Sequence, residues 1–127
     1  MRTLIVSVIS LCLLIAIWGI YYHYSNQVLH ALITNCEQEI LPAIEDEDWN
    51  AAYDLFSQQY TKWNTYQKKA SYILENDSLY KVDESYVKTL MYIKAKDLSN
   101  SSGELLALQH ELESLHKNET LTLSNIF

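Results

Sequence analysis

Residues 4–22 read LIVSVISLCLLIAIWGIYY, and this stretch decides the architecture of the chain. Only Ser7, Ser10 and Gly19 interrupt its apolar side chains, and it carries no charge. As a helix rising about 1.5 Å per residue, it would measure about 28 Å, close to the hydrocarbon layer of about 30 Å that a bilayer presents. The stretch therefore predicts a transmembrane signal anchor in residues 1–24.

Two alternatives to a permanent anchor are weaker. A cleaved signal peptide has an apolar region of about 7–15 residues followed by small residues at the cleavage site. Here the bulky Ile20, Tyr21 and Tyr22 follow Gly19 instead. Lipidation at Cys12 is disfavoured because the residue before it is leucine, where a lipoprotein signal needs a small side chain.

The basic residues predict the orientation of the span. Arg2 and the amino terminus flank it on the short side, and no Lys or Arg occurs again until Lys62. Since positive charge stays in the cytoplasm, we expect a single-pass protein of the cell membrane with a cytoplasmic N-terminus and an extracytoplasmic C-terminal domain. Trp18 and Tyr24, with the tyrosines between them, suit the outer headgroup layer.

The part after the span is acidic. All sixteen acidic residues follow it, against eight of the nine basic ones, which gives this part a formal charge of −8. Nucleic acid is therefore not an expected partner, because no basic stripe could hold a polyanion. By the same charge we expect anionic lipid headgroups to repel the domain and keep it away from the surface.

Helical spacing of apolar residues runs through the rest of the chain, which has two glycines and one proline in total. We expect an all-α protein: the transmembrane helix continues into a helical stem at residues 25–45, followed by a small up-down antiparallel bundle at residues 46–118. Residues 119–127 alternate apolar and polar side chains, and we expect them to dock on the bundle.

The stem has an apolar stripe that needs a cover, either from the bundle's own helices or from the stem of a second copy. Pro42 should kink or end this helix at Leu41, since proline disfavours helix at the preceding residue. Cys36 is either a buried small side chain or a link between two copies. The stripe consists of Leu29, Leu32, Ile33, Cys36, Ile40 and Ile44.

The second helix has the clearest seam, broken by Gln59, beside which Tyr60 could fill the gap. Four acids, residues 45–48, precede the helix; they suit either a helix start or a cation site, and we expect Asp46 to be the N-cap. We expect the tyrosines at 53, 60, 66 and 72 to pack in the core, and the alternative is an exposed binding platform. The seam consists of Trp49, Ala52, Phe56, Gln59, Trp63, Tyr66, Ala70 and Ile73.

Two further helices are expected. The third runs from about Ser78 to Asp97, and residues 98–102 form a linker. Ser101 and Glu104 have the spacing of a capping box at the start of the fourth helix, which should end near Lys117. The residues predicted to be buried are Leu79, Val82, Tyr86, Leu90 and Ile93 in the third helix, and Leu105, Leu108, Leu112 and Leu115 in the fourth.

The sequence favours a protein that is not an enzyme and needs no cofactor. Glu113 and His116 have the E-x-x-H spacing of carboxylate-bridged metal bundles, but such a site needs a second copy of the motif on another helix. The serines lack a nucleophile elbow, and the chain has no glycine-rich phosphate loop.

Three motifs resemble an uncharacterised bacterial family, the domain of unknown function 4363. They are D-W-x-x-A at residues 48–52 with Trp63 following, Y-I-x-x-K-D at residues 92–97, and L-x-L-x-N-I-F at residues 121–127. The resemblance implies a membrane protein of endospore-forming Firmicutes, often encoded beside polytopic membrane proteins. It implies no activity.

The leading hypothesis is therefore a partner-binding or stabilising protein of a membrane complex. Its partner would be an integral membrane protein or, through the stem, a second copy. The alternative is an extracytoplasmic sensor or small-ligand binder with a cavity among Trp49, Trp63 and the tyrosines. The structural or interaction candidates are Asp48, Trp49, Ala52, Phe56, Trp63, Asn125, Ile126 and Phe127.

Overall fold

The computed structural model is all-α, as predicted. It describes the backbone of residues 1–72 and 76–126 and the side chains of residues 1–72 and 76–117, and no strand occurs among them. The first helix consists of α1 (Arg2–Asn35), the π-helical turn η1 (Cys36–Ile40) and α2 (Leu41–Glu45). The others are α3 (Trp49–Ala70), α4 (Asn76–Lys94) and α5 (Leu98–Ile126).

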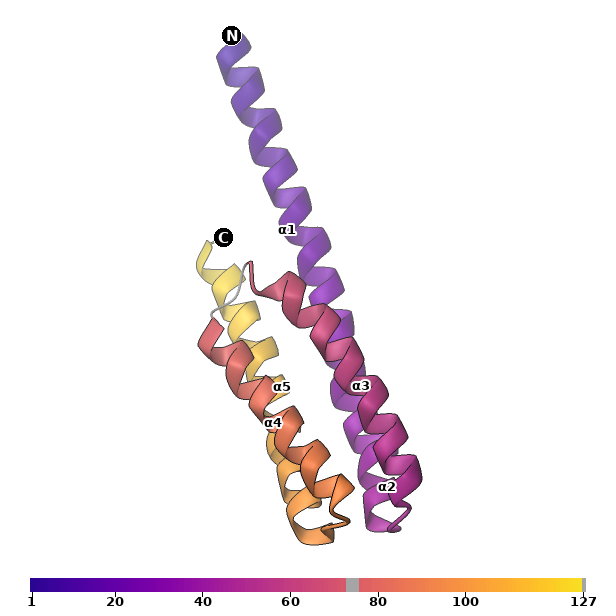
Figure 1. Ribbon diagram of the computed structural model, residues 1–127. Coiled ribbons are helices and arrows are strands. Elements are labelled where there is room, and N and C mark those ends of the chain that lie inside the picture. The colour runs from indigo at the N-terminus through magenta and orange to yellow at the C-terminus, as the bar shows by residue number, and fades with distance from the viewer. Residues whose placement is uncertain (73–75, 127) are drawn as a thin grey trace.

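Figure 1 shows α3, α4 and α5 gathered along the second part of the first helix, while the first part projects beyond them. The projecting part is apolar and exposed, and by length and composition it could cross a membrane. Burial begins at Ser25, only three residues after the apolar stretch ends. The anchor candidate and the first helix of the bundle are therefore one rod with no linker between them.

The bundle's own helices cover the stem's apolar stripe. The chain reverses between α2 and α3, again between α4 and α5, and α5 returns beside α1 to close the bundle (Figure 1). Of the stripe, Ile33 is half-buried, and the rest is buried against α3 and α5: Leu29, Leu32, Cys36, Ile40 and Ile44. The stripe thus needs no second stem to cover it.

The stem does not end at Leu41, which was one of the two predicted effects of Pro42. The helix passes Pro42 through a π-helical turn, in which the Leu41 N–H donates to the Cys36 carbonyl five residues earlier. It then continues to Glu45. A proline ring clashes with the carbonyl four residues before it in a regular α-helix, and a wider turn at that place relieves the conflict.

The corner between α2 and α3 corrects the predicted cap. Asp48, not Asp46, is the N-cap of α3, and its carboxylate accepts from the Ala51 N–H at 3.3 Å. The same residue closes the preceding helix, because its own N–H donates to the Ala43 carbonyl while Glu47 holds a left-handed φ of 56°. This is a Schellman ending followed at once by a new helix.

The corner between α4 and α5 is built in the same way. Lys96 has a φ of 57°, the Asp97 N–H donates to the Tyr92 carbonyl, and the Asp97 carboxylate accepts from the Asn100 N–H at 3.1 Å. Asp97 therefore caps α5, and the predicted capping box of Ser101 and Glu104 was wrong. The expected linker at residues 98–102 is instead the first turn of α5.

Aromatic side chains fill the centre of the bundle. The centre of the Trp63 ring lies 5.5 Å from the centre of the Tyr86 ring and 5.7 Å from that of Tyr66. The ring centres of Phe56 and Tyr86 are also 5.5 Å apart. The predicted tyrosine packing holds for Tyr66, which is buried, and for residue 60, which is half-buried. It was wrong for residues 53 and 72, which are 41% and 90% exposed.

The seams of the remaining helices match the prediction closely. Leu90 is half-buried, and residue 73 lies outside the described part of the chain. The predicted residues found buried are Ala52, Phe56, Gln59, Trp63, Tyr66 and Ala70 in α3, Leu79, Val82, Tyr86 and Ile93 in α4, and Leu105, Leu108, Leu112 and Leu115 in α5.

Polar contacts also join each pair of neighbouring helices. Such contacts fix the axial register, because sliding one helix along another would leave a buried polar group without its partner. The contacts are Ser25 with Tyr66 at 2.6 Å, Tyr60 with Asp83 at 3.5 Å, Ser85 with Glu111 at 2.7 Å, and His116 with Asn26.

The fourth predicted helix is longer than expected. Instead of ending near Lys117, the backbone of α5 stays helical to Ile126. The predicted docking of residues 119–127 concerns side chains that lie outside the described part of the structure.

The double role of Asp48 gives a stability prediction. Asp48→Ala should lower the free energy of unfolding by about 1 kcal/mol, because it removes the N-cap of α3. Asp46→Ala should change it by less than about 0.5 kcal/mol, as for an ordinary surface substitution. Urea unfolding of both variants in mild detergent, followed by circular dichroism, checks this. Equal losses would contradict the assignment of the cap.

Candidate binding groove between α1 and α3

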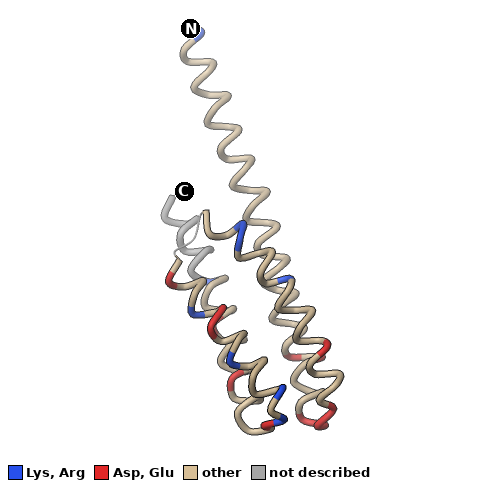
Figure 2. Tube along the Cα trace, viewed as in Figure 1, with Lys and Arg blue, Asp and Glu red and all other residues tan. Residues whose placement is uncertain are grey.

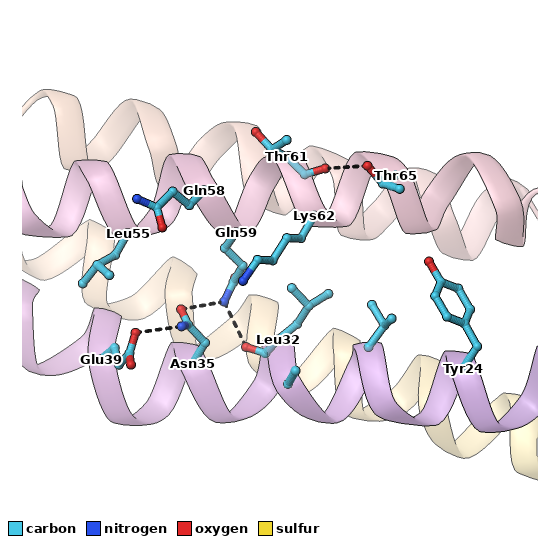
Figure 3. Close-up of a pocket in the computed structure, with 12 residues that line it drawn as sticks. Tyr24, Leu32, Asn35, Glu39, Leu55, Gln58, Gln59, Thr61, Lys62 and Thr65 are labelled. Atoms are coloured by element: carbon cyan, nitrogen blue, oxygen red, sulfur yellow. Dashed lines mark hydrogen bonds between the residues drawn. The ribbon is translucent and has the colours of Figure 1, made fainter.

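A groove runs between α1 and α3 on one side of the bundle, with a volume of about 560 Å³. Figure 3 shows the two helices side by side, with Glu39 near one end and Tyr24 near the other. Its lining comes from α1, η1 and α3: Tyr24, Val28, Ala31, Leu32, Asn35, Glu39, Leu55, Gln58, Gln59, Thr61, Lys62 and Thr65.

Gln59 forms the polar floor of the groove. Its side-chain N–H groups donate to the Leu32 carbonyl at 3.0 Å and to Asn35 Oδ1 at 3.2 Å, and its Oε1 accepts from the Cys36 thiol at 3.1 Å (Figure 3 draws the first two). Asn35 in turn donates to Glu39 at 2.8 Å. A glutamine in the seam is therefore accommodated by α1 itself, and not by a neighbouring tyrosine as predicted.

Cys36 lies behind this floor and is fully buried. Burial raises the pKa of its thiol from 9.0 to about 12, and the hydrogen bond to Gln59 opposes part of that rise. A buried protonated thiol is a poor nucleophile, because the thiolate is the reactive form. A disulfide to a second copy would require this part of the bundle to open.

The two ends of the groove differ in charge. Glu39 lies at the end near the α2–α3 corner, where residues 45–48 add four more carboxylates. Lys62 lies between the two ends with its side chain toward Gln59 (Figure 3), and Lys69 Nζ lies 4.8 Å above the centre of the Tyr24 ring at the other end. Along the first helix and α3, Figure 2 shows the same separation, with basic residues on α3 toward the projecting part of α1 and acidic residues at the opposite end.

The interaction candidates from the sequence fall elsewhere. Ala52, Phe56 and Trp63 are fully buried, Trp49 packs half-buried against the core, and Asp48 is the cap. The cavity expected around Trp63 is filled by the tyrosine rings that pack on it. Residues 125 and 126 continue α5 as backbone, with side chains outside the described part, as is residue 127.

The groove residues were not singled out from the sequence. One signal was available: Gln59 interrupts an otherwise apolar seam, and a buried polar side chain needs partners. On the facing helix, Cys36 belongs to the stem's stripe and Asn35 lies beside it. Pairing them with Gln59 would have placed the floor of the groove.

The E-x-x-H pair does not form a metal site with other ligands in the described part of the chain. His116 Nε2 hydrogen-bonds to Asn26 on α1, while Glu113 is exposed. Among residues 1–72 and 76–117, no three His, Cys, Asp or Glu side chains gather closely enough to hold a metal ion.

Comparison with known proteins identifies the family. The model of the domain of unknown function DUF4363 matches residues 18–126, most of the chain. The chain belongs to the DUF4363 family. The matched region begins inside α1 and includes every helix of the bundle, so the DUF4363 unit contains the junction between the apolar stretch and the core. No curated protein and no solved structure matches the chain.

Burial of Cys36 predicts a pH dependence of stability. Because the thiol pKa is about 12 when folded and 9.0 for a free thiol, folding favours the protonated form. This contribution is complete below pH 9, and it is lost as the pH rises toward 12, since only the unfolded chain then releases the proton.

Between pH 8.5 and 10.5 the wild-type DUF4363 protein should lose about 2 kcal/mol more unfolding free energy than Cys36→Ala. Chemical denaturation at a series of pH values measures the difference. Cys12→Ala is the matched control and should follow the wild type. Parallel curves for wild type and Cys36→Ala would show that the thiol is not buried in solution.

Proposed function

We propose that this protein is a single-span membrane protein whose extracytoplasmic bundle binds and stabilises an integral membrane partner without catalysing a reaction. The observation that carries the proposal is the continuity of the first helix. The exposed apolar part and the buried part of α1 are one helix, so the bundle has a fixed position relative to the apolar stretch.

Two contacts support a rigid junction. Directly after the apolar stretch, Ser25 bonds to Tyr66 of α3 and Asn26 bonds to His116 of α5. Two helices thus hold α1 within one turn of the point where it leaves the bundle. A tilt or rotation of the apolar part therefore moves the whole bundle. A protein that positions a membrane partner requires such a rigid connection.

The charge pattern supports the orientation. Arg2 is the only basic side chain before Lys62, and it lies at the free end of α1. Retention of positive charge in the cytoplasm then places the bundle outside.

One face of the apolar part supports contact with another membrane helix. Thr3, Ser7 and Ser10 are spaced by four and three residues and so share a face of α1. The Ser7 hydroxyl donates to the Thr3 carbonyl at 2.9 Å, which leaves its lone pairs available to a donor from a neighbouring helix. Small hydroxyl residues let membrane helices approach closely and hydrogen-bond to one another.

Purification from host membranes in mild detergent tests the proposal. The wild-type chain should retain a stoichiometric integral membrane protein. Ser7→Leu with Ser10→Leu should retain about fivefold to tenfold less of it, since interhelical hydrogen bonds and close packing are lost.

Ile5→Leu with Ile9→Leu is the matched control, because it changes the opposite face and keeps the length and apolarity of the segment. It should retain the partner fully. A wild-type chain recovered alone, or equal retention by both double variants, would count against partner binding through the span. Release of the wild-type chain from membranes without detergent would contradict the proposal that the chain spans the membrane.

A further inference from the structure

The acidic residues of this chain avoid two segments that pack together. None of the sixteen lies in residues 1–36 or 55–70. These segments form α1 and most of α3, which are neighbours in the bundle. Besides Arg2 they carry Lys62, Lys68 and Lys69, so all the Lys, Arg, Asp and Glu side chains in these two segments of a chain with a net charge of −7 are basic.

Two of these lysines border the groove. Lys62 lines it, and Lys69, seven residues later, lies about two helical turns further along the same face of α3. The ammonium group of Lys69 packs over the ring of Tyr24, which also lines the groove. In Figure 3, the Lys62 side chain extends into the space between the two helices toward Gln59, and Tyr24 stands at the end of the groove opposite Glu39.

The Tyr24 end of the groove lies at the level where the apolar stretch stops. Tyr24 is two residues beyond that stretch, about 3 Å along the helix axis. The contact of Ser25 with Tyr66 fixes α3 at the same level, so Lys68 and Lys69 follow Tyr66 toward the apolar part. Tyr72, which is 90% exposed, lies beyond them, and exposed tyrosine is typical of a membrane–water interface.

We infer that the part of the groove between Lys62 and Lys69 binds the phosphate of an anionic phospholipid in the adjacent leaflet. This inference rests on the proposed membrane anchoring. Lys62 and Lys69 contribute charge-assisted hydrogen bonds to the phosphate oxygens, and Tyr24, nearer the apolar stretch, contacts the glycerol. A free inorganic phosphate presents similar oxygens, but the position of the site beside the end of the apolar stretch favours a lipid.

Nearby carboxylates do not cancel this charge. Glu39 lies at the end of the groove opposite Tyr24 and accepts a hydrogen bond from Asn35. Asp77, in the first turn of α4, belongs to a helix that does not line the groove. The expectation that the acidic domain is repelled from anionic headgroups therefore does not apply to this face.

Native mass spectrometry of the full-length protein, titrated with lipid in mild detergent, tests the inference. Phosphatidylglycerol should bind the wild type more tightly than phosphatidylcholine, by about fivefold for each lysine that contacts the phosphate. Lys62→Gln with Lys69→Gln should remove that preference. Both side chains are exposed, so helicity should be unchanged, which circular dichroism verifies.

The matched control is Lys94→Gln with Lys96→Gln, which removes the same charge at the opposite end of the bundle and should keep the preference. Equal binding of the two lipids by the wild type, or a preference that survives Lys62→Gln with Lys69→Gln, would overturn the inference. Displacement of bound phosphatidylglycerol by millimolar inorganic phosphate would reassign the site to a free anion and overturn it as well. A chain that stays in membranes but shows no lipid preference defeats this inference alone, whereas a chain released without detergent defeats the proposed function.

Discussion

Burial of one face of residues 25–44 under α3 and α5 is the interaction on which the rest of the structure depends. The same helix is apolar all round before Tyr22 and apolar on one stripe after Ser25. The first pattern suits a hydrocarbon solvent and the second a water-exposed bundle. Because the helix does not break between them, the stripe sets where α3 and α5 lie, and the apolar stretch sets where the bundle lies relative to a membrane.

Hydrophobic periodicity was sufficient to predict most of the core. Spacings of three and four residues mark the buried leucines of α5 and the aromatic seam of α3 directly, because a helix packed on one side repeats its buried face every 3.6 residues. The corners were harder to predict. Glycine is the usual sign of a left-handed helix ending, but Glu47 and Lys96 hold that position here. The two corners share one sequence feature. In each, an isoleucine is followed four residues later by an aspartate, at residues 44–48 and 93–97.

The groove depends on features that a single helix does not reveal. It lies between α1 and α3, where Gln59 is hydrogen-bonded to the facing helix, and its character depends on which charges lie at each end. The net charge of the domain does not say where on the fold its charges lie. The fold separates the charges: carboxylates gather at the α2–α3 corner, and lysines lie on α3 beside Tyr24 (Figure 2).

Continuity of the first helix is tested most directly by hydrogen exchange of the full-length protein in lipid nanodiscs. A helix that enters the core without a linker should show slow exchange from the apolar stretch through residues 23–35 and on to Ile44, with no fast segment near Tyr24. Fast exchange at residues 23–35, with protection only on either side, would mean that a flexible linker separates anchor from bundle, and it would contradict the single-rod architecture.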